Sequence, residues 1–219
     1  MKIKRLEYSE RAMTRVELIC VVVVVGVLAA LLLPTAGSRP RQKALRISCV
    51  NNLKQIGVAF RIWENDFGAY PMEMSTNKGG TKEYDFGPQV FRHFQAMQDY
   101  LGQSPRIVVC PADTARVAAT SFTNFGNSNV SYFVGITVSA ANTNGDLFLG
   151  GDRNLNDELG PLRSVSVLTT NQQIAWGTGL HSPGGNILFS DGSVQELSTP
   201  GLKTALRNPG VAPATLAVP

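Results

Sequence analysis

The sequence predicts an α+β protein in which a long N-terminal α-helix packs on a small antiparallel β-sheet head. Three features carry this prediction. An uncharged apolar run fills residues 18–33, an apolar stripe with helical spacing follows it, and from about residue 72 short β-rich segments alternate with turn residues. One long helix followed by a set of short strands is typical of α+β folds.

The first half of the long helix is expected to span a membrane. Residues 13–33 provide 21 positions, or about 31 Å of helix at about 1.5 Å per residue, which matches the ~30 Å hydrocarbon core of a bilayer. Arg15 and Glu17 then lie at its polar edge. Pro34 is expected to kink or interrupt the helix, because its ring removes a backbone donor.

The second half of the helix is expected to be amphipathic and to lie within residues 35–70. Apolar residues recur at steps of three or four from Leu45 to Trp63, and Arg46, Lys54 and Arg61 fall toward the other face. Gly68 and a following proline mark the end of this helix. The apolar stripe predicts a core face against which a sheet packs.

The globular head is expected over residues 71–205. The sequence predicts a short helix at 89–102, a strand at 106–113, a β-rich stretch at 128–140 and a hairpin at 185–198. Asp191 and Gly192, within the hairpin, are a typical tight-turn pair. Residues 206–219 contain three prolines and no charge after Arg207, so we expect a flexible tail.

Charge and cysteine content limit the classes of function. The formal net charge of +4 is dispersed along the chain, so no nucleic-acid partner is expected. Cys20 lies in the apolar run, where it acts as a small hydrophobe. Cys49 and Cys110 follow that run, and they can pair if this part is exported to an oxidising compartment. Two unpaired buried thiols are the alternative, and no Cys or His spacing indicates zinc.

Glu17 stands out because a carboxylate near the end of a membrane helix needs a partner. Cleavage between Ala12 and Met13 would create an ammonium group one helical turn from Glu17, either in the same chain or in a parallel neighbour. Two alternatives stay open. The anchor is uncleaved with a glutamate at its edge, or the segment is a secretory signal peptide cut after Ala36.

These residues resemble the N-terminus of type IV prepilins, including the pseudopilins of type II secretion. That family has a short basic leader, a cleavage site before a hydrophobic residue, a glutamate fifth after the cut and a proline as its twenty-second residue. The matching features are the leader 1–12, the cleavage site Ala12–Met13, the glutamate Glu17 and the proline Pro34. Ala12, where the family nearly always has Gly, and Arg15, in a usually apolar position, depart from the pattern.

The resemblance implies partners and a location. A prepilin peptidase/N-methyltransferase would remove the leader, and the 13–34 helix would hold the chain in the bacterial inner membrane, N-terminus cytoplasmic and head periplasmic. The chain would then assemble with other pilin or pseudopilin subunits into a pilus or pseudopilus. Glu17 would set the register by pairing with the Met13 ammonium of a neighbour. No enzymatic activity is expected.

A second motif consists of His181, nine intervening residues and Asp191-Gly192. It resembles a group of prepilin-like proteins with this C-terminal pattern, and the phrases CVNNLKQIGVAF, VVCPAD, SYFVG and GDRNL agree with that group. From the residues themselves, His181 is expected to hydrogen-bond to the hairpin and fix its entry, while Asp191 and Gly192 supply turn geometry. Contact with a partner subunit is the alternative, and no nucleophile motif accompanies His181.

Residues 150–160 carry oxygen side chains at a spacing similar to the start of a calcium loop. They are Asp152, Asn154, Asn156, Asp157 and Glu158. The mid-loop Gly and distal Glu of an EF-hand are missing, and a solvated turn is the alternative. Some secretion pseudopilins carry calcium in a C-terminal loop, so the resemblance keeps a calcium ion as an expectation. No other cofactor is expected.

Three functions follow from these patterns. A fibre subunit assembled through its N-terminal helix is favoured over a membrane-anchored periplasmic enzyme that uses His181 and Asp191. The third is a binding module secreted after cleavage near residue 36. Identifying the first residue of the mature chain would distinguish these three functions.

Overall fold

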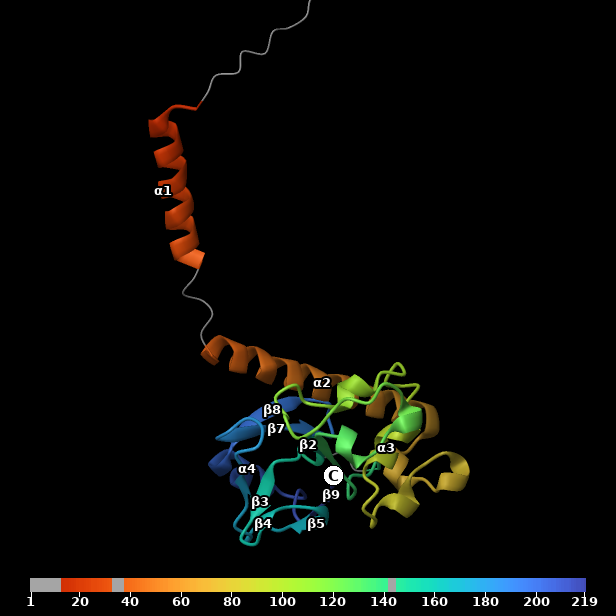
Figure 1. Ribbon diagram of the computed structural model, residues 1–219. Coiled ribbons are helices and arrows are strands. Elements are labelled where there is room, and N and C mark those ends of the chain that lie inside the picture. The colour runs from red at the N-terminus through yellow and green to blue at the C-terminus, as the bar shows by residue number, and fades with distance from the viewer. Residues whose placement is uncertain (1–12, 33–37, 142–144) are drawn as a thin grey trace, which may run out of the picture. The chain divides into compact units, whose positions relative to one another are not determined.

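The structure of the chain is a computed structural model that describes residues 13–32, 38–141 and 145–219 (Figure 1). It divides into two compact units, Met1–Arg41 and Gln42–Pro219. The first unit contains helix α1 (Arg15–Leu32). Helix α2 (Ser38–Phe67) begins in the first unit and runs into the second, which holds every later element.

The expected single long helix is not confirmed. In its place the described residues up to Phe67 hold two helices, α1 and α2, while residues 33–37, and with them Pro34, lie outside the description. Among the helices of the described ranges, none combines the length and apolar character needed to cross a membrane.

The described part of the head is built from short elements. Its helices are α3 (Phe91–Ala96) and α4 (Thr199–Leu206), and its 3-10 turns are η2 (Pro71–Glu73), η3 (Thr76–Lys78), η4 (Lys82–Tyr84), η5 (Pro105–Val108), η6 (Phe122–Asn124) and η7 (Asn127–Asn129). The strands are β1 (Tyr132–Gly135), β2 (Phe148–Asp152), β3 (Leu155–Asp157), β4 (Gly160–Pro161), β5 (Ser164–Leu168), β6 (Ala175–Trp176), β7 (Gly184–Phe189), β8 (Val194–Ser198) and β9 (Ala214–Val218).

Six of these strands form one antiparallel sheet in the order β5-β9-β1-β2-β7-β8. Successive side chains of a strand point to opposite faces, and the central strands use both. Phe133 of β1 and Ile187 of β7 belong to one buried cluster, whereas Val134 and Leu188, the next residues along, belong to the other. The sheet therefore separates two hydrophobic cores.

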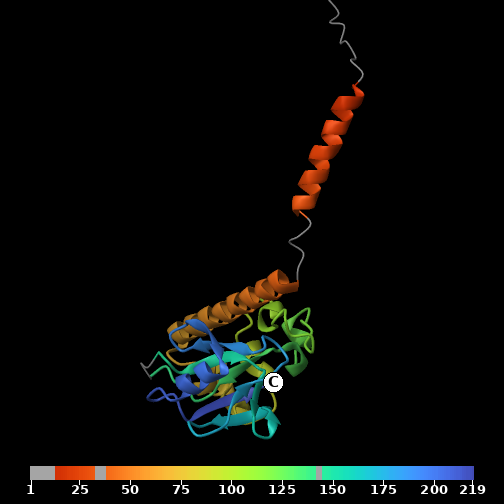
Figure 2. The same cartoon turned by 90° about the vertical axis from the view of Figure 1, so that its left-hand side faces the viewer.

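Helix α2 covers the face of the sheet that carries Val134 and Leu188 (Figure 2). The predicted apolar stripe is buried there from its second position onward, with Cys49, Leu53, Ile56, Phe60 and Trp63 each no more than 4% exposed. At Gly57 the helix comes so close to the sheet that an added Cβ would lie 2.7 Å from the Leu188 side chain. The opposite face, which carries Phe133 and Ile187, is covered by α4 and by a small sheet in the order β4-β3-β6.

Two elements of the head differ from those that the sequence predicts. The strand expected at 106–113 is wrong: Pro105 starts the 3-10 turn η5, and Pro111 cannot donate to a ladder, so this segment contributes only single bonds such as Ser131 N to Val108 O. The helix expected at 89–102 shrinks to α3, because the chain turns from Met97 on and reaches Gly102 at φ +60°.

The flexible tail expected at 206–219 is also wrong. Residues 214–218 form β9, which lies between β5 and β1 in the large sheet. Leu216, Ala217 and Val218 are at most 2% exposed. The prolines flank this strand rather than interrupt it, so they do not prevent pairing.

A disulfide joins Cys49 of α2 to Cys110, the pairing that the sequence left open, and Cys20 is a free, exposed cysteine. The two bonded residues are 61 positions apart, and both are completely buried. The bond ties α2 to the loop that leads into β1.

We predict that breaking this bond lowers the free energy of unfolding by about 4 kcal/mol, because closing a loop of this length restricts the unfolded chain by about that amount. Denaturant unfolding of the full chain, with and without a thiol reductant, measures the difference. The double variant Cys49→Ala/Cys110→Ala should show the loss without reductant, and Cys20→Ser should behave like the original chain. Equal stability of the oxidised and reduced chains would contradict the prediction.

Candidate functional site

His181 is buried where the disulfide meets the β7–β8 hairpin. Its ring is 4% exposed, and its Nε2 lies 3.2 Å from Sγ of Cys110. A disulfide sulfur can only accept, so Nε2 carries the proton and donates it toward the sulfur. The carbonyl of His181 accepts from the N–H of Gly184, the first residue of β7, at 2.8 Å. The backbone carbonyl of His181 thus bonds to the start of the hairpin, while its ring lies against the disulfide of α2. The structural role expected for the motif stays a prediction.

Asp152, at the end of β2, lies beside His181 in this site. It is completely buried, and its Oδ2 accepts from both the backbone N and the side-chain Nδ2 of Asn186, at 2.8 and 2.9 Å. The same Oδ2 lies 3.9 Å from His181 Nε2. Asp152 Oδ1 is buried without a hydrogen-bond partner among the described residues. These contacts connect β2, β7 and the His181 segment.

The protonation of Asp152 and His181 is governed by burial. Loss of water raises the pKa of Asp152 to about 7, although the two bonds from Asn186 oppose the shift. Burial also lowers the pKa of His181, with the nearby Arg46 charge as a second cause. Both shifts favour the uncharged forms, so burial at this site favours a neutral pair over an ion pair.

Arg46 closes the site at the surface. The sequence placed this residue on the outer face of α2, but it turns to the hairpin and pairs with Glu196 of β8. A second guanidinium nitrogen donates to the carbonyl of His181 at 3.0 Å. Long Arg side chains bury their stems while the charged head stays near solvent, which lets Arg46 join α2 to β8 and to the segment that leads into β7.

Asp191 and Gly192 lie at the far end of the hairpin from His181. Asp191 Oδ1 accepts from the backbone N of Ser193 at 2.7 Å, and Gly192 adopts φ +85°, a conformation that favours glycine. The six residues of β7 separate this turn from the His181 end, which is about 20 Å of extended chain. His181 and Asp191 therefore do not converge on one substrate.

Metal binding by the site depends on the state of its cysteines. Within the described ranges, the group of three His, Cys, Asp or Glu residues with ligand atoms close together is Cys49, Cys110 and His181, whose ligand atoms lie within 4.8 Å of one another. Cysteine binds zinc as a thiolate, and here the two sulfurs are bonded to each other. The oxidised chain does not offer this site to a metal.

The side chains of the expected calcium loop have different partners. Asp152 faces inward to Asn186, whereas Asp157 Oδ1 accepts from the N–H of Leu159 in a local turn. Asn154 Nδ2 donates to the carbonyl of Gly177, Asn156 lies in β3 and Glu158 is exposed. Described carboxylates of this segment do not gather into a group that could hold an ion. Calcium binding stays a prediction.

At the N-terminus, Glu17 forms a capping box with Thr14. Glu17 Oε2 accepts from the N and Oγ1 of Thr14 at 2.8 and 2.9 Å, and the N–H of Glu17 donates to Thr14 Oγ1 at 3.3 Å. Such reciprocal bonds satisfy backbone donors that a helix start leaves free. The sequence signal, Thr followed three residues later by Glu, was present but was not used. Met13 is exposed, and Ala12 lies outside the described residues.

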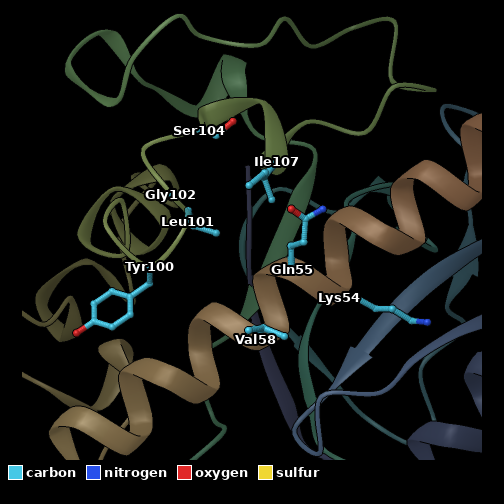
Figure 3. Close-up of a pocket in the computed structure, with 8 residues that line it drawn as sticks. All are labelled: Lys54, Gln55, Val58, Tyr100, Leu101, Gly102, Ser104 and Ile107. Carbon is cyan, nitrogen blue, oxygen red and sulfur yellow. The ribbon is translucent and has the colours of Figure 1, made fainter.

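A shallow pocket of about 600 Å³ lies between α2 and the segment from Tyr100 to Ile107 (Figure 3). Val58 and Gln55 of α2 face Leu101 and Ile107 across it. Lys54 is its one charged lining residue. Lys54 and Tyr100 are its titratable lining residues, and the hydroxyl of Tyr100 donates to Asp66 Oδ2 at 3.0 Å.

Sequence reasoning did not find three members of the His181 site. Asp152 was assigned to a calcium loop, Arg46 to the outer face of α2, and Asn186 was not singled out. The alternation of the hairpin could have placed Asn186 on a buried face, but its bond to β2 depends on the strand order.

We predict that Asp152 makes stability fall as pH rises. Its folded-state pKa of about 7 lies above its ordinary value of 3.8, so the folded chain holds this proton more tightly than the unfolded chain. The resulting stabilisation is complete below about pH 4 and is lost as pH rises to about 7, by up to about 4 kcal/mol. Asp152→Asn, which keeps an oxygen acceptor for Asn186, should lack this slope.

The measurement is the free energy of unfolding of both proteins between pH 4 and 8. Asp85 also has a pKa raised to about 7 by burial, but it is present in both proteins, so their difference isolates Asp152. The variant should gain stability relative to the original chain as pH rises. Parallel pH profiles would show that Asp152 does not titrate in this way.

Comparison with known proteins gives one family match. Residues 38–107 match the model of a family described as a protein of unknown function (DUF1559), which is associated with pilin-like, prepilin-type proteins. The match covers 70 of the 219 residues, from the start of α2 through η5. Comparison with curated proteins and with solved structures found no match. The family match suggests a pilin-like or secreted protein and does not reach the His181 motif.

Proposed function

We propose that the chain is a prepilin-like subunit that is cleaved before Met13, held in the inner membrane by its N-terminal segment and assembled through that segment into a pilus or pseudopilus. Its partners would be a prepilin peptidase/N-methyltransferase and other pilin-like subunits. The work of such a subunit is mechanical rather than catalytic. The family match over residues 38–107 supports a pilin-like protein, and α1 is the observation that carries the finer proposal.

Helix α1 exposes large apolar side chains in every direction. Each of the following is at least 50% exposed: Val16, Leu18, Ile19, Val21, Val22, Val23, Val24, Val25, Val27 and Leu28. Five consecutive valines cover more than one full turn, so the helix has no polar face in that stretch. A helix that is apolar all round needs lipid or other helices around it. Packing of α1 with copies of itself meets that need.

Glu17 can support such packing while it caps α1. Both hydrogen bonds from Thr14 reach Oε2 of Glu17, which leaves Oε1 to accept from another group. An ammonium group at Met13 of a neighbouring chain would be a suitable donor. In apolar surroundings an unpaired carboxylate is costly, so this pairing would favour one stagger of neighbouring helices.

The His181 site supports a structural role for the second motif. His181 and Asp152 are buried and engaged with Cys110 and Asn186. Asp191 serves the turn at the other end of β7. An enzyme built on His181 and Asp191 gains no support from these positions. The disulfide fits a head that folds in an oxidising compartment.

The register role of Glu17 can be separated from its capping role by three variants expressed in a host with the assembly machinery. Glu17→Ala removes both the charge and the cap, Glu17→Gln keeps an oxygen for the cap without the charge, and Thr14→Ala weakens the cap but keeps the charge. We expect all three to be cleaved. We expect Glu17→Ala and Glu17→Gln to fail to assemble, and Thr14→Ala to assemble.

Cleavage is read from the mass of the chain, and assembly from the amount recovered in sheared fibres or cross-linked oligomers. Normal assembly of Glu17→Gln would overturn the register role and leave Glu17 as a capping residue. Failure of Thr14→Ala alone would likewise show that the cap, and not the charge, controls assembly.

A further inference from the structure

The segment that the sequence matched to a calcium loop lines a pocket with the opposite charge preference. The pocket has a volume of about 540 Å³ and lies beside β3, β4 and the loop that follows β6. Its charged lining side chains are Arg116, Arg153 and Arg163, and no carboxylate side chain lines it. The volume lies within the range of about 300–1,000 Å³ that is usual for small-molecule sites.

The positive charge of this pocket is only partly balanced. Arg153 forms a two-pronged bond with Asp113, with Nε to Oδ2 at 2.7 Å and NH2 to Oδ1 at 2.8 Å. Arg116 donates to the backbone oxygen of Pro219 at 2.9 Å. Arg163 is exposed, and its guanidinium has no carboxylate partner within the described ranges. Even if a terminal carboxylate at Pro219 balances Arg116, the charge of Arg163 remains.

Two buried polar atoms on the lining residues lack partners. Arg116 Nε, a donor, and Asn154 Oδ1, an acceptor, are both buried without a hydrogen bond among the described residues. Asn154 is 7% exposed, and its other amide atom is held by Gly177 O at 2.9 Å. Buried polar groups are normally satisfied. Both atoms are shielded from solvent, so a ligand with an anionic group and hydroxyl groups would give them partners only if their side chains turn toward the pocket.

We propose that this pocket binds a small organic anion that also carries hydroxyl groups, such as a sugar acid or a sugar phosphate. Arg163 and Arg116 would hold the anionic group, because guanidinium groups form charge-assisted hydrogen bonds with carboxylate and phosphate. Asn154, Asn156 and Thr178, which also line the pocket, would bond the hydroxyl groups. This binding function is independent of fibre assembly.

The test is calorimetric titration of the full chain, kept in mild detergent, with three probes at fixed ionic strength. D-glucuronate offers a carboxylate, glucose 6-phosphate offers a phosphate, and glucose is the neutral control. The variants are Arg163→Gln and the matched control Arg106→Gln, since Arg106 is an exposed arginine that does not line the pocket. Circular dichroism confirms that each variant is folded.

We expect at least one of the two anions to bind at least about tenfold more tightly than glucose. Arg163→Gln should weaken that anion about tenfold, which corresponds to the loss of one charge-assisted contact, and Arg106→Gln should not. The anion that binds more tightly shows whether the pocket prefers a carboxylate or a phosphate. The proposal is overturned if neither anion binds more tightly than glucose, or if Arg163→Gln and Arg106→Gln bind it equally.

Discussion

The junction between α2 and the large sheet depends on the Cys49–Cys110 disulfide and on His181, whose ring lies against it. These residues come from three distant parts of the sequence, and none of the three segments could fix the others by local bonds. The disulfide holds the loop before β1 to α2, and His181 adds the start of the β7–β8 hairpin. Asn186 of β7 then donates to Asp152 of β2, which connects the hairpin to β2. The result is a buried polar site in which every connection joins different elements.

Local periodicity explains the parts of the fold that the sequence predicted well. The stripe through Leu53, Ile56 and Phe60 repeats every three or four residues, and such a pattern has one stable solution, a helix with that face buried. The Asp191-Gly192 turn is also marked by its own residues, whose bonds link Phe189 and Asp191 to Ser193. One further bond, from Asp191 N to the carbonyl of Gly145 at 3.3 Å, comes from outside the turn. Both features could therefore be predicted without knowledge of the tertiary structure.

The remaining features depend on strand order and were not predicted. Residues 214–218 look like a proline-flanked tail, yet they fill the gap between β5 and β1, and only that gap makes Leu216 a core residue. The same limit applies to the chemistry of residues 152–158. Spacing alone indicated a cation loop, but the fold buries Asp152 against Asn186 and brings Arg116 and Arg163 beside Asn154. Strand order therefore decides which side chains surround this segment.

The proposed function depends on a group that the uncleaved chain does not possess, the ammonium at Met13. Glu17 caps α1 through Thr14 in the uncleaved chain, so this cap does not by itself reveal processing. The most direct measurement is the mass of the mature N-terminal peptide from cells that export the chain. We predict a chain that begins at Met13 and carries an N-methyl group. A chain that still begins at Met1, or one that begins at Gly37 or Ser38, would contradict processing as a prepilin.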